Sequence, residues 1–241
     1  MIPAPPLLSV VLPCFNEAAS LCDLVKRFAD FGAGKDFELV LVDNGSTDGT
    51  RSILRRLLDE RRFDFARTVR LPENRGYGGG LWAGLNAARG QYLAWTHADL
   101  QCDPDDVFIA LKALQASADP LRTLVKGLRR RRSLFAELTT RGMQVAASLI
   151  LRKAFRDING QPKVFHRSLM GALTDPPTDL SFDLYVLNQA IERGWSIATV
   201  PVVFGARAHG RSRWAFSLAS RCAHVVSSLR YMIRLRGRSK A

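Results

Sequence analysis

The sequence lacks long hydrophobic runs, closely spaced cysteines and a full share of acidic residues. Its four cysteines lie far apart with no Cys-x-x-Cys pair, which favours reduced thiols over a disulfide framework. No apolar run approaches the roughly 18 residues needed to span a bilayer. The N-terminus also lacks the basic region of a signal peptide. We therefore expect a cytoplasmic protein that is soluble or lies on a membrane surface without crossing it.

The shortage of acidic residues leaves the 241-residue chain with a formal net charge of +13, from 35 Lys and Arg against 22 Asp and Glu. Such a surface favours anionic partners, which include nucleic acid, acidic lipid headgroups and phosphorylated substrates. The composition is otherwise globular, because 47% of the residues are hydrophobic, enough for a sizeable core. The length predicts one large α/β domain rather than two small ones.

Apolar strand patterns alternate with helical patterns along the chain. In the first half we expect strands at residues 7–12, 39–42, 68–71 and 92–95, and helices at residues 17–31, 50–61, 79–88 and 104–116. Repeated β-α units of this length imply a mostly parallel sheet with helices on both faces. The second half is less regular, and its predicted elements are strands at 124–125, 164–166 and 197–204 and helices at 134–155, 182–193 and 214–235.

The most informative stretch follows the predicted strand at residues 92–95 and contains His97, Asp99, Gln101 and Asp103. Alternate residues of an extended chain point the same way, so the first three can share one side of the strand end. Open α/β sheets hold their ligands at such ends. An imidazole, a carboxylate and an amide oxygen suit Mn²⁺ or Mg²⁺ holding a diphosphate. The alternative is a polar loop that ends at Asp103 and starts the next helix.

Two other strand ends carry small polar and acidic residues. A carboxylate in such a place can accept a hydrogen bond from a base N–H or from ribose hydroxyls. Asp48 can equally be a helix N-cap. Three such ends on neighbouring strands are harder to explain by chance than one. The residues are Pro13, Asn16 and Glu17 after the first strand, and Asp43, Asn44 and Asp48 after the second.

Together these residues resemble the family 2 glycosyltransferases of the GT-A fold, and within them the polyprenyl-phosphate branch that is similar to dolichol-phosphate mannose synthase. The resemblance extends over residues 7–213. It implies a GT-A domain at residues 1–213, followed at residues 214–241 by a basic amphipathic helix and tail. The matching stretches are residues 9–17, 42–48, 73–76, 97–101 and 200–213, with Gly84 and Gly90.

The resemblance implies a role for each matching position. Donor binding is expected of Pro13, Asn16, Glu17, Asp43 and Asn44. The metal and diphosphate are expected at His97, Asp99 and Gln101, and phosphate contacts at Arg207, Gly210, Ser212 and Arg213. Asp99, Arg207 and Arg213 are therefore candidate catalytic residues.

Three departures from the family pattern change the expected chemistry. His97 replaces an acid, and because imidazole is softer than carboxylate it favours Mn²⁺ over Mg²⁺, or else weakens the dependence on metal. Asn44 replaces a second acid, which leaves one formal charge fewer near the base. Arg213 replaces Lys, so a planar guanidinium with several hydrogen-bond donors stands where a compact ammonium group is expected.

The expected acceptor side is basic. Arg129 and Arg141 match the spacing at which the resembled branch holds a lipid phosphate, although Val145 stands where a Ser is expected. The alternative is a solvated basic face. Asp183 matches an acidic position in related transferases and is the candidate base for a hydroxyl acceptor, whereas a phosphate acceptor needs none. A buried or capping carboxylate is the other interpretation. The remaining basic residues of this region are Lys126, Arg130, Arg131, Arg132, Arg152 and Lys153.

The predicted last helix is amphipathic and rich in arginine. Such a helix can lie on an anionic membrane, or it can pack on the domain and expose its arginines. Its apolar side holds Leu218, Cys222, Val225, Val226, Leu229, Met232 and Ile233, and Arg221, Arg230, Arg234 and Arg238 lie elsewhere.

We therefore expect an inverting, metal-dependent glycosyltransferase on the cytoplasmic face of a membrane. Its donor would be a nucleotide diphosphate-sugar, its acceptor polyprenyl phosphate or another lipid-linked molecule, and its cofactor Mn²⁺ or Mg²⁺. A transferase that acts on a saccharide hydroxyl is the rival enzyme. A basic nucleic-acid-binding module is the other rival, but the sequence lacks the aromatic and basic alternation of RNA-reading sheets, so we expect no nucleic-acid partner.

Overall fold

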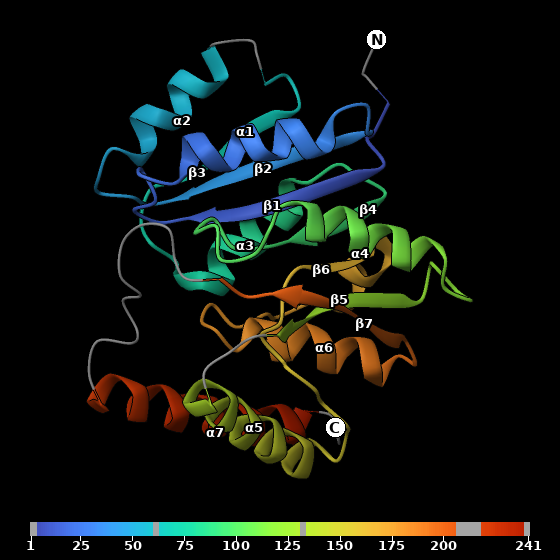
Figure 1. Ribbon diagram of the computed structural model, residues 1–241. Coiled ribbons are helices and arrows are strands. Elements are labelled where there is room, and N and C mark those ends of the chain that lie inside the picture. The colour runs from blue at the N-terminus through green and yellow to red at the C-terminus, as the bar shows by residue number, and fades with distance from the viewer. Residues whose placement is uncertain (1–3, 60–62, 131–133, 206–217, 239–241) are drawn as a thin grey trace.

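The computed structural model describes residues 4–59, 63–130, 134–205 and 218–238 (Figure 1). Within these ranges a seven-stranded sheet has the order β3-β2-β1-β4-β6-β5-β7. Neighbouring strands are parallel, except that β6 is antiparallel to both β4 and β5. The predicted mostly parallel α/β sheet is therefore confirmed. The strands are β1 (Leu8–Cys14), β2 (Phe37–Asn44), β3 (Ala66–Leu71), β4 (Tyr92–Trp95), β5 (Thr123–Arg130), β6 (Lys163–His166) and β7 (Ser196–Val203).

Helices cover both faces of this sheet (Figure 1). Helices α1, α2 and α4 supply buried residues to the core on one face. Helices α3, α5, α6 and α7 supply the core on the other face. The helices are α1 (Leu21–Gly32), α2 (Thr50–Asp59), α3 (Gly76–Ala87), α4 (Asp105–Gln115), α5 (Leu134–Leu151), α6 (Phe182–Glu192) and α7 (Leu218–Arg238), with a 3₁₀ helix η1 (Arg167–Ala172).

The continuous apolar runs of the central strands follow from this three-layer arrangement. In β1, Val10 and Leu12 join the core under α1 and α4, whereas Val11 joins the core under α3 and α6. Because successive side chains of a strand point to opposite faces, a strand covered on both sides must be apolar throughout. In β4, Leu93 and Trp95 alternate with their neighbours in the same way.

Every predicted helix and strand occurs, and all but the strand at residues 92–95 have shifted boundaries. The helix expected from residue 17 begins only at Leu21, because the backbone N–H groups of Ser20 and Leu21 both donate to the carbonyl of Glu17 in a turn. The strand expected at residues 124–125 extends to Arg130, because it pairs along its whole length with β7. The antiparallel direction of β6 and the helix η1 had no counterpart in the prediction. Residues 214–217 of the predicted last helix lie outside the described ranges.

The strand register brings three polar loops to one edge of the sheet. Cys14 at the end of β1 lies opposite Asp43 of β2. On the other side of β1, Val11 lies opposite Trp95 at the end of β4. The segments at residues 13–17, 43–48 and 96–101 therefore leave three adjacent strands at their carboxyl ends, which is where parallel sheets hold their ligands.

Candidate active site

Two carboxylates lie at the ends of β1 and β2. Asp43 is buried, and its Oδ1 accepts a hydrogen bond of 3.0 Å from the backbone N–H of Ser46. Glu17 is half-buried, and its Oε2 accepts one of 3.1 Å from the hydroxyl of Ser20. Burial, together with these two carboxylates, raises the pKa of the Cys14 thiol far above its ordinary value. The thiol therefore stays neutral, and the acids supply the charge of this part of the edge.

Asn16 and Pro13 lie beside these carboxylates. The backbone of Asn16 is left-handed, with φ 58°, a conformation that Asn tolerates better than most residues. Its Oδ1 accepts a hydrogen bond of 2.8 Å from the N–H of Thr47, and its own N–H donates to Ser46 Oγ at 3.2 Å. Pro13 is half-buried and lies beside Gly80 of α3. The side chain of Asn16 thus ties the loop after β1 to the loop after β2.

Asn44 faces the start of α3. Its Nδ2 donates to the carbonyl of Gly76 at 2.9 Å, and its Oδ1 accepts from the N–H of Arg75 at 3.0 Å. Both ends of the buried amide are therefore engaged by the loop at residues 73–76. This side chain, which is predicted to contact the donor, holds that loop against the end of β2.

The three predicted metal ligands lie in the turn after β4. Asp99 is buried, and its Oδ1 accepts a hydrogen bond of 3.1 Å from the N–H of Gln101. The Nε2 of Gln101 donates to the carbonyl of Gly205 at 3.2 Å, so this side chain also fastens the segment after β7. His97 is half-buried, and its ring centroid lies 6.3 Å from that of Tyr77. Burial lowers the pKa of His97, although Asp99 draws it the other way, so the imidazole is neutral at physiological pH.

The chemistry of His97 and Asp99 fits a divalent cation. Neutral imidazole is the form that binds a metal, and a carboxylate suits Mn²⁺ or Mg²⁺. Within the described ranges no three His, Cys, Asp or Glu side chains are grouped to hold a metal by themselves. A cation here would therefore complete its coordination with phosphate oxygens and water, as Mg²⁺ commonly does. Asp103, by contrast, turns toward the start of α4, where its Oδ1 accepts from the N–H of Asp105 at 3.1 Å.

A buried polar network that was not predicted lies next to this turn. Lys163 at the start of β6 forms an ion pair with Asp183 of α6, and both side chains are buried. The Nε1 of Trp95 donates to the same carboxylate at 3.3 Å. Burial and then the charge of Asp183 raise the pKa of Tyr77 well above its ordinary value. The hydroxyl of Tyr77 accepts a hydrogen bond from Gln161. The predicted candidate base is therefore surrounded by hydrogen-bond donors.

A second buried ion pair occupies the end of β5. The Nε of Arg129 donates to Asp157 Oδ1 at 3.0 Å, and both side chains are largely buried. The guanidinium also lies over the ring of Phe204, 5.3 Å from its centroid. Nearby, Lys126 is buried and donates to the carbonyl of Arg156 at 2.9 Å, and burial lowers its pKa to about 7. Arg129, which was predicted to hold a lipid phosphate, therefore already shares part of its donor edge with Asp157.

The predicted basic region is divided among different environments. Arg141 projects from α5 with 67% of its side chain exposed and pairs with Glu137 at 2.7 Å. Lys153 pairs with Glu192, also at 2.7 Å. Neither of these ion pairs involves Arg129. Arg131, Arg132, Arg207, Gly210, Ser212 and Arg213 lie outside the described residues.

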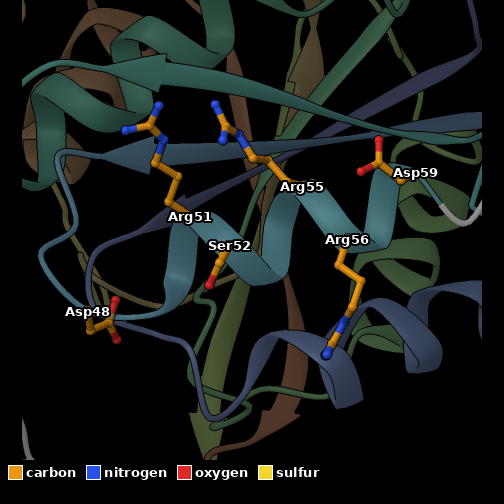
Figure 2. Close-up of a pocket in the computed structure, with 6 residues that line it drawn as sticks. All are labelled: Asp48, Arg51, Ser52, Arg55, Arg56 and Asp59. Atoms are coloured by element: carbon orange, nitrogen blue, oxygen red, sulfur yellow. The ribbon is translucent and has the colours of Figure 1, made fainter.

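A separate, open hollow of about 670 Å³ lies along α2 (Figure 2). Arg51 and Arg55 extend together from one side of the helix, and Arg56 points toward α1, where its Nη2 lies 3.7 Å from Cys22 Sγ. At the start of the helix, Asp48 accepts a hydrogen bond of 2.9 Å from the N–H of Thr50, the first residue of α2. None of the predicted metal ligands lines this hollow, which displays part of the positive charge of the chain.

The sequence is similar to curated transferases that act on a lipid phosphate. It is 29% identical over 210 residues to the undecaprenyl-phosphate 4-deoxy-4-formamido-L-arabinose transferase of Edwardsiella ictaluri, which covers 86% of this chain and 62% of that protein. It is 26% identical over 224 residues to the Klebsiella pneumoniae protein of the same name, and this match covers 90% of this chain and 65% of that protein. The chain thus spans less than two thirds of the length of these relatives.

The fold is similar to that of glucosyl-3-phosphoglycerate synthase from Mycobacterium tuberculosis. The structure of that enzyme with Mn²⁺, uridine diphosphate and glucosyl-3-phosphoglycerate superimposes with a TM-score of 0.72 and 26% sequence identity, covering 95% of this chain and 80% of that one. Its complex with Mg²⁺ and uridine diphosphate gives a TM-score of 0.71. The family model for glycosyl transferase family 2 matches residues 9–170, more than half of the chain. The chain therefore belongs to glycosyl transferase family 2.

Proposed function

We propose that this protein transfers a sugar from a nucleotide diphosphate-sugar to polyprenyl phosphate or another lipid-linked acceptor. The observation that carries the proposal is the meeting of three polar strand ends at one sheet edge, with Asp43 opposite Cys14 and the His97–Asp99 turn on the next strand. The relatives that act on undecaprenyl phosphate support the acceptor class. The similar enzyme that binds uridine diphosphate supports the donor class.

On the donor side, Asp43 and Glu17 accept hydrogen bonds from the nucleoside, and Pro13 lies against it. Asp43 is buried, so a base N–H or a ribose hydroxyl that reaches it pairs with a carboxylate shielded from water. Asn16 and Asn44 act indirectly, because their side chains hold the loops at residues 46–47 and 73–76. The donor pocket therefore depends on two carboxylates and on two amides that position the backbone around them.

His97, Asp99 and Gln101 would hold a divalent cation at the diphosphate end of the donor. When bound, the cation neutralises the negative charge that develops on the departing nucleoside diphosphate. Asp99 supplies the charge, and His97 supplies a neutral nitrogen ligand. The Mn²⁺ and Mg²⁺ complexes of glucosyl-3-phosphoglycerate synthase support either metal. We further assign Arg207, Ser212 and Arg213, which lie outside the described residues, to the same phosphates.

The acceptor is more consistent with a phosphate than with a sugar hydroxyl. A hydroxyl needs a base to remove its proton, and the candidate base Asp183 is buried in an ion pair with Lys163 and accepts from Trp95 as well. A phosphate oxygen is already anionic and attacks the anomeric carbon without a base. The new bond to that carbon forms as the bond to the diphosphate breaks, so attack from the opposite face inverts the centre. Arg129 and Arg141 are our candidates to hold the acceptor phosphate.

A lipid acceptor requires the protein to work at a membrane surface. Among the described residues, no helix is both long and apolar enough to cross a bilayer. The +13 charge favours reversible attachment to anionic lipid, and we assign the protein to the cytoplasmic face, whose leaflet carries a negative surface potential.

The experiment is a transfer assay with the purified chain, Mn²⁺ or Mg²⁺, a panel of uridine and guanosine diphosphate-sugars, and detergent-dissolved polyprenyl phosphate. We expect nucleoside diphosphate release that depends on both the metal and the lipid phosphate. A saccharide without phosphate that replaces the lipid as acceptor would redirect the assignment to the hydroxyl-acceptor enzyme. Release from no donor in the panel would reject the proposal.

A further inference from the structure

Helix α5 presents an apolar stripe to solvent. Leu138, Val145 and Leu149 are 65%, 55% and 72% exposed, respectively. Their spacing of seven and then four residues puts them on one side of the helix. The opposite side packs into the core through Ala147 and Leu151. The stripe is therefore separate from the surface that holds α5 on the domain.

Helix α7 divides its apolar residues in a similar way. Met232 and Leu235 are buried in the same core as α5, so part of the predicted apolar side packs on the domain. Val226 and Ile233, seven residues apart, are 44% and 63% exposed. The two helices pack against each other and lie together at the end of the molecule opposite α2 (Figure 1). Five of the nine large exposed hydrophobic side chains among the described residues lie on this helix pair.

Exposed arginines accompany both stripes. Arg141 lies on the exposed side of α5, and Arg152 follows its last residue. On α7, Arg230 and Arg234 are exposed beside Ile233. Apolar side chains flanked by arginines match the boundary of an anionic bilayer, where the apolar groups enter the acyl region and the guanidinium groups meet phosphates. A soluble protein partner would leave this pattern of charge unexplained unless its surface were equally acidic.

We propose that the exposed side of α5, together with the outward residues of α7, is a docking surface for an anionic lipid bilayer. This assignment rests on the proposed function, because the protein needs to dock on a membrane only if its acceptor is a membrane lipid. It goes beyond that function by assigning the contact to α5, which follows the strand end that carries Arg129. A phosphate held near that strand end would then lie close to the surface on which the bilayer rests.

The test is flotation of the full chain with vesicles of phosphatidylcholine, alone or mixed with phosphatidylglycerol. The variant is Leu138→Gln with Leu149→Gln, and the matched control is Ile109→Gln with Leu121→Gln. The control residues are 47% and 51% exposed but lie outside the helix pair. Because all four side chains are exposed, we expect each variant to melt like the parent chain, which a thermal scan checks.

We expect the α5 variant to reduce the vesicle-bound fraction about tenfold on anionic vesicles, and the control variant to leave it unchanged. Binding of the parent chain should weaken as salt is added. Flotation of the α5 variant at the level of the parent chain would overturn the proposal. So would an α5 variant that converts a dimer into a monomer in sedimentation while its flotation is unchanged, because the stripe would then join two copies.

The outcome does not depend on catalysis. Flotation needs no donor or acceptor, so it remains informative if the transfer assay detects no activity. Conversely, the α5 variant should transfer sugar to detergent-dissolved polyprenyl phosphate at the rate of the parent chain, because its changed residues lie outside the site. A loss of transfer in detergent would assign the stripe to the catalytic machinery and reject a docking role.

Discussion

Lys163 and Asp183 form an ion pair in the interior of the domain, where their side chains are 0% and 2% exposed. Lys163 begins the antiparallel strand β6, and Asp183 lies in the first turn of α6. The same carboxylate accepts a hydrogen bond from Trp95, two residues before His97. The pair therefore joins a strand, a helix and the turn that carries the proposed metal ligands.

Breaking this ion pair should destabilise the protein strongly. Lys163→Met leaves the Asp183 carboxylate buried without its counter-ion, and we expect a loss of about 3–5 kcal/mol in the free energy of unfolding. The double variant Lys163→Met with Asp183→Leu should lose less than the two single changes added together. Urea unfolding measures all three. Arg141→Met, at an exposed pair, is the control and should lose no more than about 1 kcal/mol. A Lys163 variant as mild as this control would contradict the prediction.

In the proposed donor site, Asp43 contacts the nucleoside. Asp43→Ala should weaken nucleotide binding by roughly 1–3 kcal/mol, because an N–H or hydroxyl group of the bound nucleoside would be buried without a hydrogen-bond acceptor. Asp43→Asn separates this role from a structural one, since an amide oxygen can still accept from the N–H of Ser46 while its NH₂ group repels a nucleoside donor. Calorimetry with the nucleoside diphosphate is the measurement. Full affinity in the Asn variant would limit Asp43 to holding its own loop.

The metal assignment makes Asp99 indispensable. Asp99→Ala should abolish metal-dependent transfer while the protein remains folded, which circular dichroism checks. His97→Asp should shift the preference from Mn²⁺ toward Mg²⁺, because a carboxylate is a harder ligand than imidazole. Transfer rates over a range of each metal measure the shift. An unchanged ratio of Mn²⁺ to Mg²⁺ activity would remove His97 from the ligands, and activity in Asp99→Ala would reject the site.

The folding stability of the protein should decrease at low pH because of Glu38. Burial alone would raise the pKa of its carboxyl, but hydrogen bonds from Arg67, Ser9 and the backbone of Arg89 lower it from 4.5 to about 2. Because the folded pKa is the lower one, the stabilisation is complete above about pH 4.5 and is lost as the pH falls toward 2. Glu38→Gln should cost on the order of 2–3 kcal/mol at pH 7 and flatten the stability curve over that window. Denaturant midpoints measured from pH 2 to 7 test this, with Glu137→Gln as the exposed control.

Gly84 shows where the domain has no room for a side chain. A Cβ at this position of α3 would meet Val11 of β1 and would lie 2.7 Å from Val42 Cγ2 of β2. Gly84→Ala should therefore destabilise the protein by about 1–3 kcal/mol through overpacking. Gly142 of α5 has open space around it, so Gly142→Ala should instead stabilise the helix by about 0.5–1 kcal/mol. Thermal unfolding of both variants gives the comparison, and effects of the same sign would contradict it.

The sequence by itself determined the layered α/β architecture and the edge of the sheet at which the three polar loops of the proposed site meet. Local patterns were sufficient for this, because a strand covered on both faces must be apolar throughout and the polar residues after it must leave at its carboxyl end. The predicted strand at residues 92–95 is β4 without a shift. The hydrogen bonds that Asp48 and Asp103 accept at the starts of α2 and α4 are local as well, because each joins residues two positions apart.

Only the tertiary structure decided which charged side chains pair. Asp157 is 28 residues from Arg129 along the chain, and Asp183 is 20 from Lys163. Neither pairing has a local signature, because each depends on which strand lies beside β4 and in which direction it runs. The tertiary structure also decided which apolar residues of α7 are buried. Helical spacing put Met232 and Ile233 on one predicted side, but packing against the domain buried the first and left the second exposed, because the position of a helix fixes how much of its apolar side the core can cover.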